Sequence, residues 1–188
     1  GKVLGKPIEL LSIDHQNKPD IASNKAREWF DKDKVDILGE VAASAPSLAA
    51  IKIAKEKNRI VLLSGPAATR ITNEDCTPIT AHWTYDTYAM AAGTGRAVVK
   101  DGGDSWFFIT VDYTFGHSLE KDTADMVKAS GGKVLGSVRH PFPSTDFSSF
   151  LLQAQASGAK VIGLANGGTD TLNALKQASE FGITPKQR

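Results

Sequence analysis

Short apolar segments alternate with amphipathic segments along almost the whole chain. The apolar segments have the length of buried strands and lie at residues 8–14, 35–41, 60–63, 79–83, 106–111, 134–138 and 161–165. Between them, apolar residues recur at helical spacing and predict helices at residues 20–30, 46–58, 86–100, 115–130, 145–154 and 169–182. This order predicts an α/β fold with parallel sheets covered by helices, in which ligands bind at the carboxyl ends of the strands.

The pattern pauses at Asp101–Asp104, where two glycines stand between two aspartates, and then restarts with an apolar strand. We therefore expect residues 1–100 to form a first lobe, residues 101–104 a hinge or linker, and residues 105–188 a second lobe with its own sheet. Repeated βα units are also indicated by three similar short segments, which are Lys34–Gly39, Lys133–Gly136 and Lys160–Gly163.

Three of the predicted strands end in loops of small residues, at 39–44, 64–69 and 165–169. At least two of these loops lead directly into a helix, so unpaired backbone N–H groups and the positive end of a helix dipole face the space beyond the strands. This arrangement predicts an edge that binds anions. No obvious nucleophile, general base or metal cluster accompanies the loops, which favours binding over chemistry.

Composition and charge narrow the class of protein. The 188 residues are 41% hydrophobic and 23% charged, and 22 basic against 21 acidic residues give a net charge of +1. This balance gives no electrostatic reason to expect nucleic acid as a partner. No apolar run approaches the roughly 18 residues of a membrane span. The chain begins without Met and without a signal peptide, so we expect a mature product or a piece of a longer protein.

The cysteine and histidine residues of this sequence give no indication of a disulfide or a metal site. Cys76 is the only cysteine, which excludes an internal disulfide, and we expect it to be a small buried or half-buried filler. The four histidines lack the spacing of metal ligands, and we expect surface or turn positions for His15, His82, His117 and His140. The sequence therefore predicts neither a metal nor a cofactor.

A set of short segments, in order along the whole chain, resembles one family. The sequence is similar to the type I solute-binding proteins of ABC transporters, in the branch related to leucine, isoleucine and valine binding. The segments that carry the resemblance are Asp14–Pro19, Lys34–Gly39, Ser64–Thr69, Trp83–Tyr88, Asp112–Gly116 and the pair Asp146–Phe147. The resemblance implies two Rossmann-like lobes joined by a hinge, which close on a small solute and deliver it to a membrane permease.

The resemblance also implies a location and a length. Such proteins are periplasmic, or extracellular and membrane-anchored in a bacterium without an outer membrane. A full-length relative begins with a further strand and helix before Gly1 and continues well past Arg188. We therefore expect this chain to be an internal fragment with incomplete sheets, and we expect it to self-associate through unpaired edges and exposed apolar faces.

By the same resemblance, the solute-binding residues lie in the small-residue loops and in the aromatic positions beside them. They are Ala43, Ser44, Ser64, Ala68, Thr69, Trp83, Tyr85, Phe115, Asn166, Gly167 and Gly168. Two positions depart from the amino-acid binders: Ala43 stands where a serine holds the ligand carboxylate, and Gly167–Gly168 stand where an aromatic side chain is common. Smaller loops leave room for a wider ligand, so we expect an aromatic acid first and a branched-chain amino acid next.

Each of these residues also has a purely structural interpretation. Ser44 and Thr69 belong to a residue type that caps helices and turns. Trp83 and Tyr85 are also typical of core or hinge packing, and Gly167–Gly168 of a tight turn.

The function itself has two alternatives. A ligand sensor that passes closure to a partner protein has the same fold. A Rossmann-like enzyme acting on a small carboxylate would use Asp14, Asp112 or His117 as acid or base. The sequence contains no P-loop, no Gly-x-Ser-x-Gly motif and no Gly-x-Gly-x-x-Gly after a strand, which favours a binding protein over an enzyme.

Overall fold

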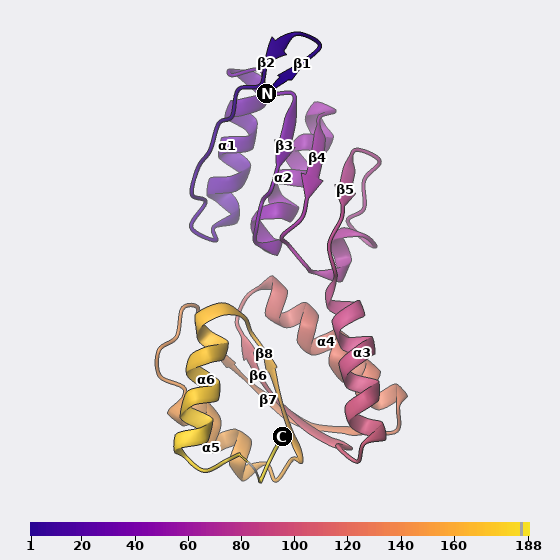
Figure 1. The fold of residues 1–188 in the computed structure, drawn as a ribbon, viewed down its shortest axis with the longest axis vertical. Helices are drawn as coiled ribbons and strands as arrows, with labels where there is room; N and C mark the ends of the chain where they lie inside the picture. Colours follow the sequence, from indigo (N-terminus) through magenta and orange to yellow (C-terminus); the bar gives the residue numbers. More distant parts are fainter. Residues whose placement is uncertain (185) are drawn as a thin grey trace.

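Two separate parallel sheets form the framework of the molecule (Figure 1), in a computed structural model that describes residues 1–184 and 186–188. The first sheet has the order β3-β4-β5, with strands Ile37–Gly39, Ile60–Leu63 and Thr80–His82. The second has the order β7-β6-β8, with strands Lys133–His140, Ser105–Val111 and Val161–Ala165. The α/β fold class and the separation of residues 60–63 and 106–111 into different sheets are confirmed.

Two helices cover the first sheet. In α1 (Pro19–Asp31), Pro19 lies in the first turn and the apolar face carries the buried Ala26 and Phe30. That face packs against α2 (Ser44–Lys57) and the buried side of β4. Asn58 ends α2 in the left-handed conformation that stops a helix.

The chain crosses between the two halves through residues 83–86, which join β5 to α3 (Thr87–Lys100). Val98 and Val99 of α3 pack against the core of the second half, and α3 lies along α4 (Thr114–Ala129). The predicted hinge at 101–104 is instead the turn between α3 and β6. The difference arises because the apolar side of α3 covers the second sheet rather than the first.

The second sheet is covered on both faces, as the nearly continuous apolar run along β6 requires. Trp106 and Phe108 pack toward α4 on one side, whereas Phe107 and Ile109 pack toward the opposite side. That opposite side is covered by α5 (Ser148–Ala156) and α6 (Gly168–Glu180) (Figure 1). The core of this half therefore has two layers, one on each face of the sheet.

The first eighteen residues differ from the expectation of a buried strand. Two very short strands, β1 (Lys2–Val3) and β2 (Lys6–Pro7), form a hairpin, and residues 8–14 belong to no strand. Apolar side chains in this segment are exposed, and Leu10 is 88% exposed. Residues 8–14 pair with no strand of the described sheets, and the backbone N–H of Ile8 donates to the carbonyl oxygen of Gly1 at 3.0 Å. Among the described residues, no helix is long and apolar enough to cross a membrane.

A cleft between the two halves as the candidate functional site

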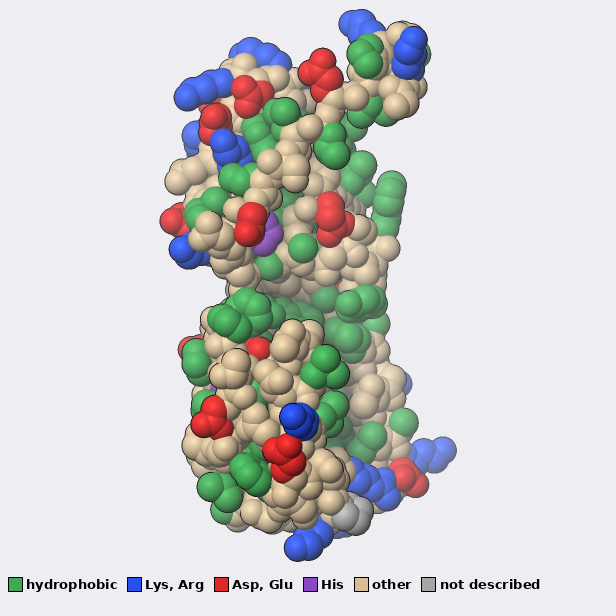
Figure 2. Space-filling view, turned by 60° about the vertical axis from the view of Figure 1, so that its left-hand side comes forward, with side chains coloured by type: hydrophobic (Ala, Val, Ile, Leu, Met, Phe, Trp, Pro, Cys, Tyr) green, Lys and Arg blue, Asp and Glu red, His purple; other side chains and the backbone are tan. Residues whose placement is uncertain are grey.

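The carboxyl ends of the two sheets lie toward the waist of the molecule (Figure 1), and hydrophobic side chains gather along this waist in the space-filling view (Figure 2). A cleft of about 430 Å³ opens here between the two halves. The first half contributes Thr69, Arg70 and Glu74 to its lining. Helix α4 contributes the other side, with Thr114, His117, Ser118, Lys121 and Asp122. This cleft is therefore shared between the halves, and Thr69 is the one sequence-predicted site residue in its lining.

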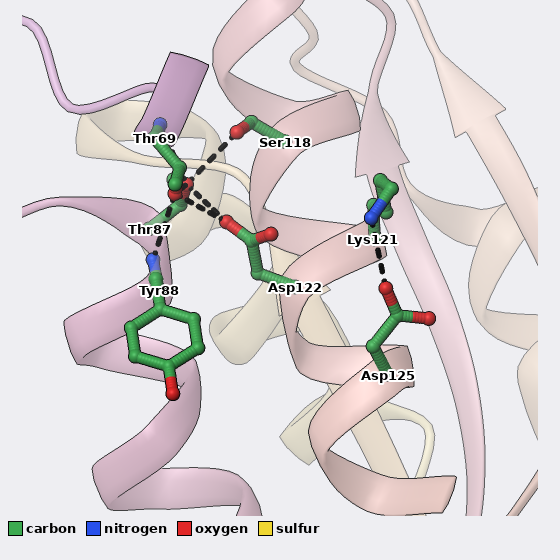
Figure 3. A network of polar contacts seen from close by, with 7 residues as sticks. All are labelled: Thr69, Thr87, Tyr88, Ser118, Lys121, Asp122 and Asp125. Carbon is green, nitrogen blue, oxygen red and sulfur yellow. Dashed lines mark hydrogen bonds and ion pairs between the residues drawn. The ribbon is translucent and has the colours of Figure 1, made fainter. Parts of the chain in front are cut away.

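One carboxylate oxygen ties the two sides of this cleft together (Figure 3). Asp122 Oδ2 accepts a hydrogen bond of 2.6 Å from Thr69 Oγ1 and another of 2.6 Å from Thr87 Oγ1. The Thr87 hydroxyl is fully buried and also lies 2.8 Å from Ser118 Oγ. The network joins the short 3-10 helix η1 (Thr69–Ile71) to the beginning of α3 and the middle of α4.

This network explains what Thr69 does in the structure. Its hydroxyl oxygen accepts from the backbone N–H of Tyr88 at 3.0 Å, in addition to the contact with Asp122. Sequence reasoning assigned Thr69 to the solute and overlooked Asp122 and Thr87. No motif marks those two, because the contact depends on α3 and α4 lying side by side.

Ser44 brings two of the predicted loops together. Its buried hydroxyl oxygen accepts the backbone N–H groups of Ala67 at 3.3 Å and Ala68 at 3.1 Å. Ala43 precedes it in extended conformation and begins α2. Ser64 lies on the exposed side of the second loop, where its hydroxyl bonds to the carboxylate of Glu40. The hydroxyl proton of Ser44 remains available as a donor.

The two predicted aromatic residues of the first half lie on the crossing segment. Trp83 is 75% exposed and Tyr85 is 59% exposed, directly before α3. Neither side chain is part of a buried core, so both rings are accessible from solvent. Exposed rings of this size are able to stack on a planar solute.

The remaining predicted residues meet in the second half. A Cβ atom added at Gly167 would lie 3.8 Å from Cε1 of Phe115, so the two loops are in contact. Gly168 begins α6 with a φ of 60°, a conformation that favours glycine. The structure therefore groups the predicted residues into a first-half set (Ala43, Ser44, Ser64, Ala68 and Thr69), a second-half set (Phe115, Asn166, Gly167 and Gly168) and the crossing segment between them.

His140 is not the surface or turn residue that the sequence predicted, because it is 0% exposed. It ends β7, and its Nε2 lies 3.2 Å from Nδ2 of Asn166 at the end of β8. Nearby, burial and the negative charge of Asp170 raise the pKa of the Tyr113 hydroxyl. His140 lies at the carboxyl end of a strand. Because parallel strands bring their carboxyl ends together, this position was the sequence signal for a contact with the end of a neighbouring strand. Cys76 also differs from expectation and is exposed.

Three of the charged groups at the cleft are paired with neighbours of their own half. Arg70 Nε lies 2.5 Å from Asp75, His117 Nε2 lies 2.8 Å from Asp112, and Lys121 Nζ lies 2.8 Å from Asp125. The hydrogen bond from Lys121 to Asp125 raises the pKa of the Lys121 ammonium. Within the described residues, no group of three His, Cys, Asp or Glu side chains could hold a metal ion.

Helix termini supply a different kind of donor. Helices α2, α4 and α6 each follow a strand, and none of the three has a side-chain hydrogen bond capping its first turn. Their first backbone N–H groups therefore lie at the carboxyl ends of β3, β6 and β8 with the positive ends of the helix dipoles. The arrangement suits non-covalent binding of an anion.

Comparison with known proteins gives one consistent result. The family model described as periplasmic binding protein matches residues 1–188. A periplasmic binding protein from Burkholderia mallei is 57% identical, with a TM-score of 0.96 over 100% of this chain and 50% of that one. A branched chain amino acid ABC transporter periplasmic ligand-binding protein from Burkholderia xenovorans is 37% identical, with a TM-score of 0.77 over 100% of this chain and 50% of that one.

A more distant structure shares the fold. A solute-binding protein of an ABC transporter from Rhodopseudomonas palustris, in complex with 3,4-dihydroxy benzoic acid, is 22% identical and has a TM-score of 0.87 over 98% of this chain and 50% of that one. The chain spans about half the length of these solved structures. With two parallel-sheet halves around a shared cleft and a family match over its whole length, the chain belongs to the type I periplasmic binding proteins.

Proposed function

We propose that the complete protein is the periplasmic solute-binding component of an ABC uptake transporter, and that it captures a small carboxylate between its two halves. The observation that carries this proposal is the set of uncapped helix starts on both sides of the waist, from α2 in one half and from α4 and α6 in the other. Backbone N–H groups at helix starts bind carboxylates well. The buried Ser44 hydroxyl supports this edge by accepting the backbone N–H groups of Ala67 and Ala68.

An aromatic acid is the solute class that the side chains favour. Trp83 and Tyr85 present exposed rings, and Gly167–Gly168 leave space next to Phe115. Ring stacking adds on the order of 0.5–1.5 kcal/mol beyond the buried area. A branched-chain amino acid is the next candidate, and it would need a carboxylate for its ammonium group.

Calorimetric titration of the complete protein tests the assignment. The panel contains benzoate and cinnamate on one side and leucine and valine on the other, the two classes that the names of the structural relatives also contain. We expect heat of binding with the aromatic acids and a much weaker response to the amino acids. Tight binding of leucine or valine with no response to aromatic acids would overturn the aromatic assignment and leave the solute-binding role intact.

Substitution of the exposed rings tests the stacking contribution. Trp83→Ala and Tyr85→Ala are each expected to weaken benzoate binding by about threefold to tenfold, since one stacking contact is lost. Phe181→Ala is the matched control, because Phe181 is also exposed but lies at the opposite end of α6 from Gly167–Gly168. Equal affinities in all three variants would show that the rings do not contact the solute.

Two further observations separate transport from its alternatives. Genes for a permease and an ATPase beside the gene for this protein favour uptake, whereas a regulator gene favours a ligand sensor. Recovery of benzoate unchanged after prolonged incubation distinguishes a binding protein from an enzyme acting on a carboxylate.

A further inference from the structure

The polar contacts between the two halves are concentrated at one place. In the part of the chain that the structure describes, each ion pair joins groups within residues 1–82 or groups within residues 87–188. Each hydrogen bond that crosses between these two ranges uses Ala67 or Thr69 on the side of the first half. A change in the angle between the halves therefore turns about these two residues or breaks their contacts.

Each side of this contact belongs to a well-packed part of its own half. In the first half, the buried Ser44 hydroxyl accepts two backbone N–H groups of the loop 64–69, which fixes the loop to the start of α2. In the second half, α3 lies along α4 (Figure 1), and a Cβ atom added at Gly95 would lie only 3.3 Å from Cγ of Met126. The helices α3 and α4 therefore form one packed unit.

Two hydrogen bonds hold the first turn of α3 against the loop 64–69. The Thr87 N–H donates to the carbonyl oxygen of Ala67 at 2.8 Å, and the Tyr88 N–H donates to Thr69 Oγ1 at 3.0 Å. Both bonds end on α3, directly after the covalent crossing. Alone, they would allow the second half to turn about the start of this helix.

A third hydrogen bond reaches the other helix of the unit. Thr69 Oγ1 donates to Asp122 Oδ2 on α4 at 2.6 Å, and Thr87 Oγ1 donates to the same oxygen at 2.6 Å (Figure 3). Hydrogen bonds of this length between a hydroxyl and a carboxylate belong to the strong class. Because Thr69 is now bonded to both α3 and α4, the second half has less freedom to turn against the first.

We propose that the hydrogen bond between Thr69 Oγ1 and Asp122 Oδ2 is a clasp, which holds the two halves at the described angle when no solute is bound. Thr69 and Asp122 line the cleft of about 430 Å³ from opposite halves, so a wider opening of this cleft lengthens the bond. With the clasp made, the described angle is the main state of the protein. Loss of the clasp leaves only the contacts to α3 and shifts the population toward separated halves.

Distances between spin labels on the two halves test the clasp in the complete protein without solute. Lys55→Cys on α2 and Lys128→Cys on α4 provide exposed labelling positions, and Cys76→Ser removes the exposed native thiol. Both helices begin at the waist, and the labels lie near their far ends, where a rotation at the waist produces the largest displacement. Pulsed electron paramagnetic resonance then gives the distribution of distances.

Removal of either partner is expected to widen this distribution. For Asp122→Ala and for Thr69→Val, we expect the population with a longer distance to rise about twofold to tenfold over the wild type, the range for one hydrogen bond. The double variant is expected to resemble the single variants, because all three lack the same contact. Thr69→Ser keeps a hydroxyl and is expected to keep the wild-type distribution. Wild-type distances in both single variants, with folding checked by circular dichroism, would overturn the proposal.

Ser118→Ala is the matched control within the same network. Ser118 Oγ lies 2.8 Å from Thr87 Oγ1, and both groups belong to the second half, so the substitution leaves the clasp in place. We expect it to keep the wild-type distances. Widening equal to that of Thr69→Val would overturn the proposal, because the packing of α3 on α4 would then set the angle. No solute is present in these measurements, so their outcome is independent of the proposed function.

Discussion

Gly116 lies in the first turn of α4, where the helix backbone comes closest to the ends of β6 and β8. A Cβ atom at this position would overlap the carbonyl oxygen of Val111 and lie 3.0 Å from that of Ala165. Gly116→Ala is therefore expected to lower the free energy of unfolding by about 1–3 kcal/mol, because the helix must move away from the sheet. Urea denaturation of the complete protein measures the change.

Gly93 is the matched control for this substitution. It lies inside α3 with no atom within 4 Å of an added Cβ. Gly93→Ala is expected to raise the free energy of unfolding by up to about 1 kcal/mol, through helix propensity alone. Equal stability of the two variants would contradict the packing that places α4 at the cleft.

Substitution of Asp122 is also expected to lower the stability of the folded protein. Asp122→Ala removes the acceptor of two threonine hydroxyls and leaves that of Thr87 buried, so we expect a loss of about 1–3 kcal/mol in the free energy of unfolding. Asp125→Ala on the same helix removes only an exposed pair with Lys121 and is expected to change stability by less than about 0.5 kcal/mol. Similar unfolding curves for both variants would show that the network does not join the two halves.

At the scale of the elements, α1 and α2 are tied at their carboxyl ends by an ion pair. Lys57 Nζ lies 2.6 Å from Asp31 Oδ1, and this hydrogen bond holds the pKa of the Asp31 carboxyl below its ordinary value. A carboxyl with a lowered folded-state pKa stabilises the protein above its unfolded pKa of about 3.9, and that stabilisation is lost as the pH falls through the lowered value.

The substitution Asp31→Asn tests the direction of this pH dependence of stability. The variant is expected to be less stable than the wild type at neutral pH. It is expected to be equally stable at a pH below the lowered pKa, where the carboxyl group is protonated in both the folded and the unfolded protein. Asp36→Asn is the control, because its side chain is 90% exposed and lies 3.5 Å from Arg59. Thermal unfolding across this pH range measures the difference, and a gap between Asp31→Asn and wild type that persists in acid would contradict the ion-pair explanation.

The elements also show what sequence patterns can predict. Strands β4 and β8 begin and end as the apolar runs predict, and Asp86 caps α3 through a hydrogen bond of 2.7 Å from the Ala89 N–H. These features are local and depend on a few neighbouring residues. The family resemblance followed from the same kind of signal, in short segments spread along the chain.

Features that depend on distant partners could not be predicted in this way. Residues 8–14 have the composition of a strand, yet pairing requires a neighbour that hydrophobic periodicity does not identify. Whether α3 belongs to the first or the second half depends on which sheet Val98 and Val99 cover. The contacts of His140 and Asp122 form only when segments distant in the sequence come together in the fold. The sequence therefore predicted the loops of the candidate site but not the buried polar side chains that support them.

At the scale of the whole molecule, the exposed apolar segment at residues 8–14 predicts association of the 188-residue chain when it is made alone. Light scattering with size-exclusion chromatography is expected to show a mass that rises with concentration. Leu10→Lys is expected to reduce the association, whereas Leu172→Lys on α6 is not, although Leu172 is 68% exposed. A single monomer at all concentrations would contradict this expectation.

The two halves are joined by residues 83–86 and by the network around Asp122, and their loops of small residues face the waist. A solute held there would contact both halves at once. Such a shared contact links the fold, the uncapped helix starts and the proposed function.

A crystal structure of the complete protein with benzoate would show whether the solute contacts both halves. We predict a carboxylate at the waist between the halves, bonded to the start of α2 on one side and to the start of α4 or α6 on the other, with the ring next to Trp83 or Tyr85. Benzoate bound to one half alone, or away from the waist, would contradict this prediction.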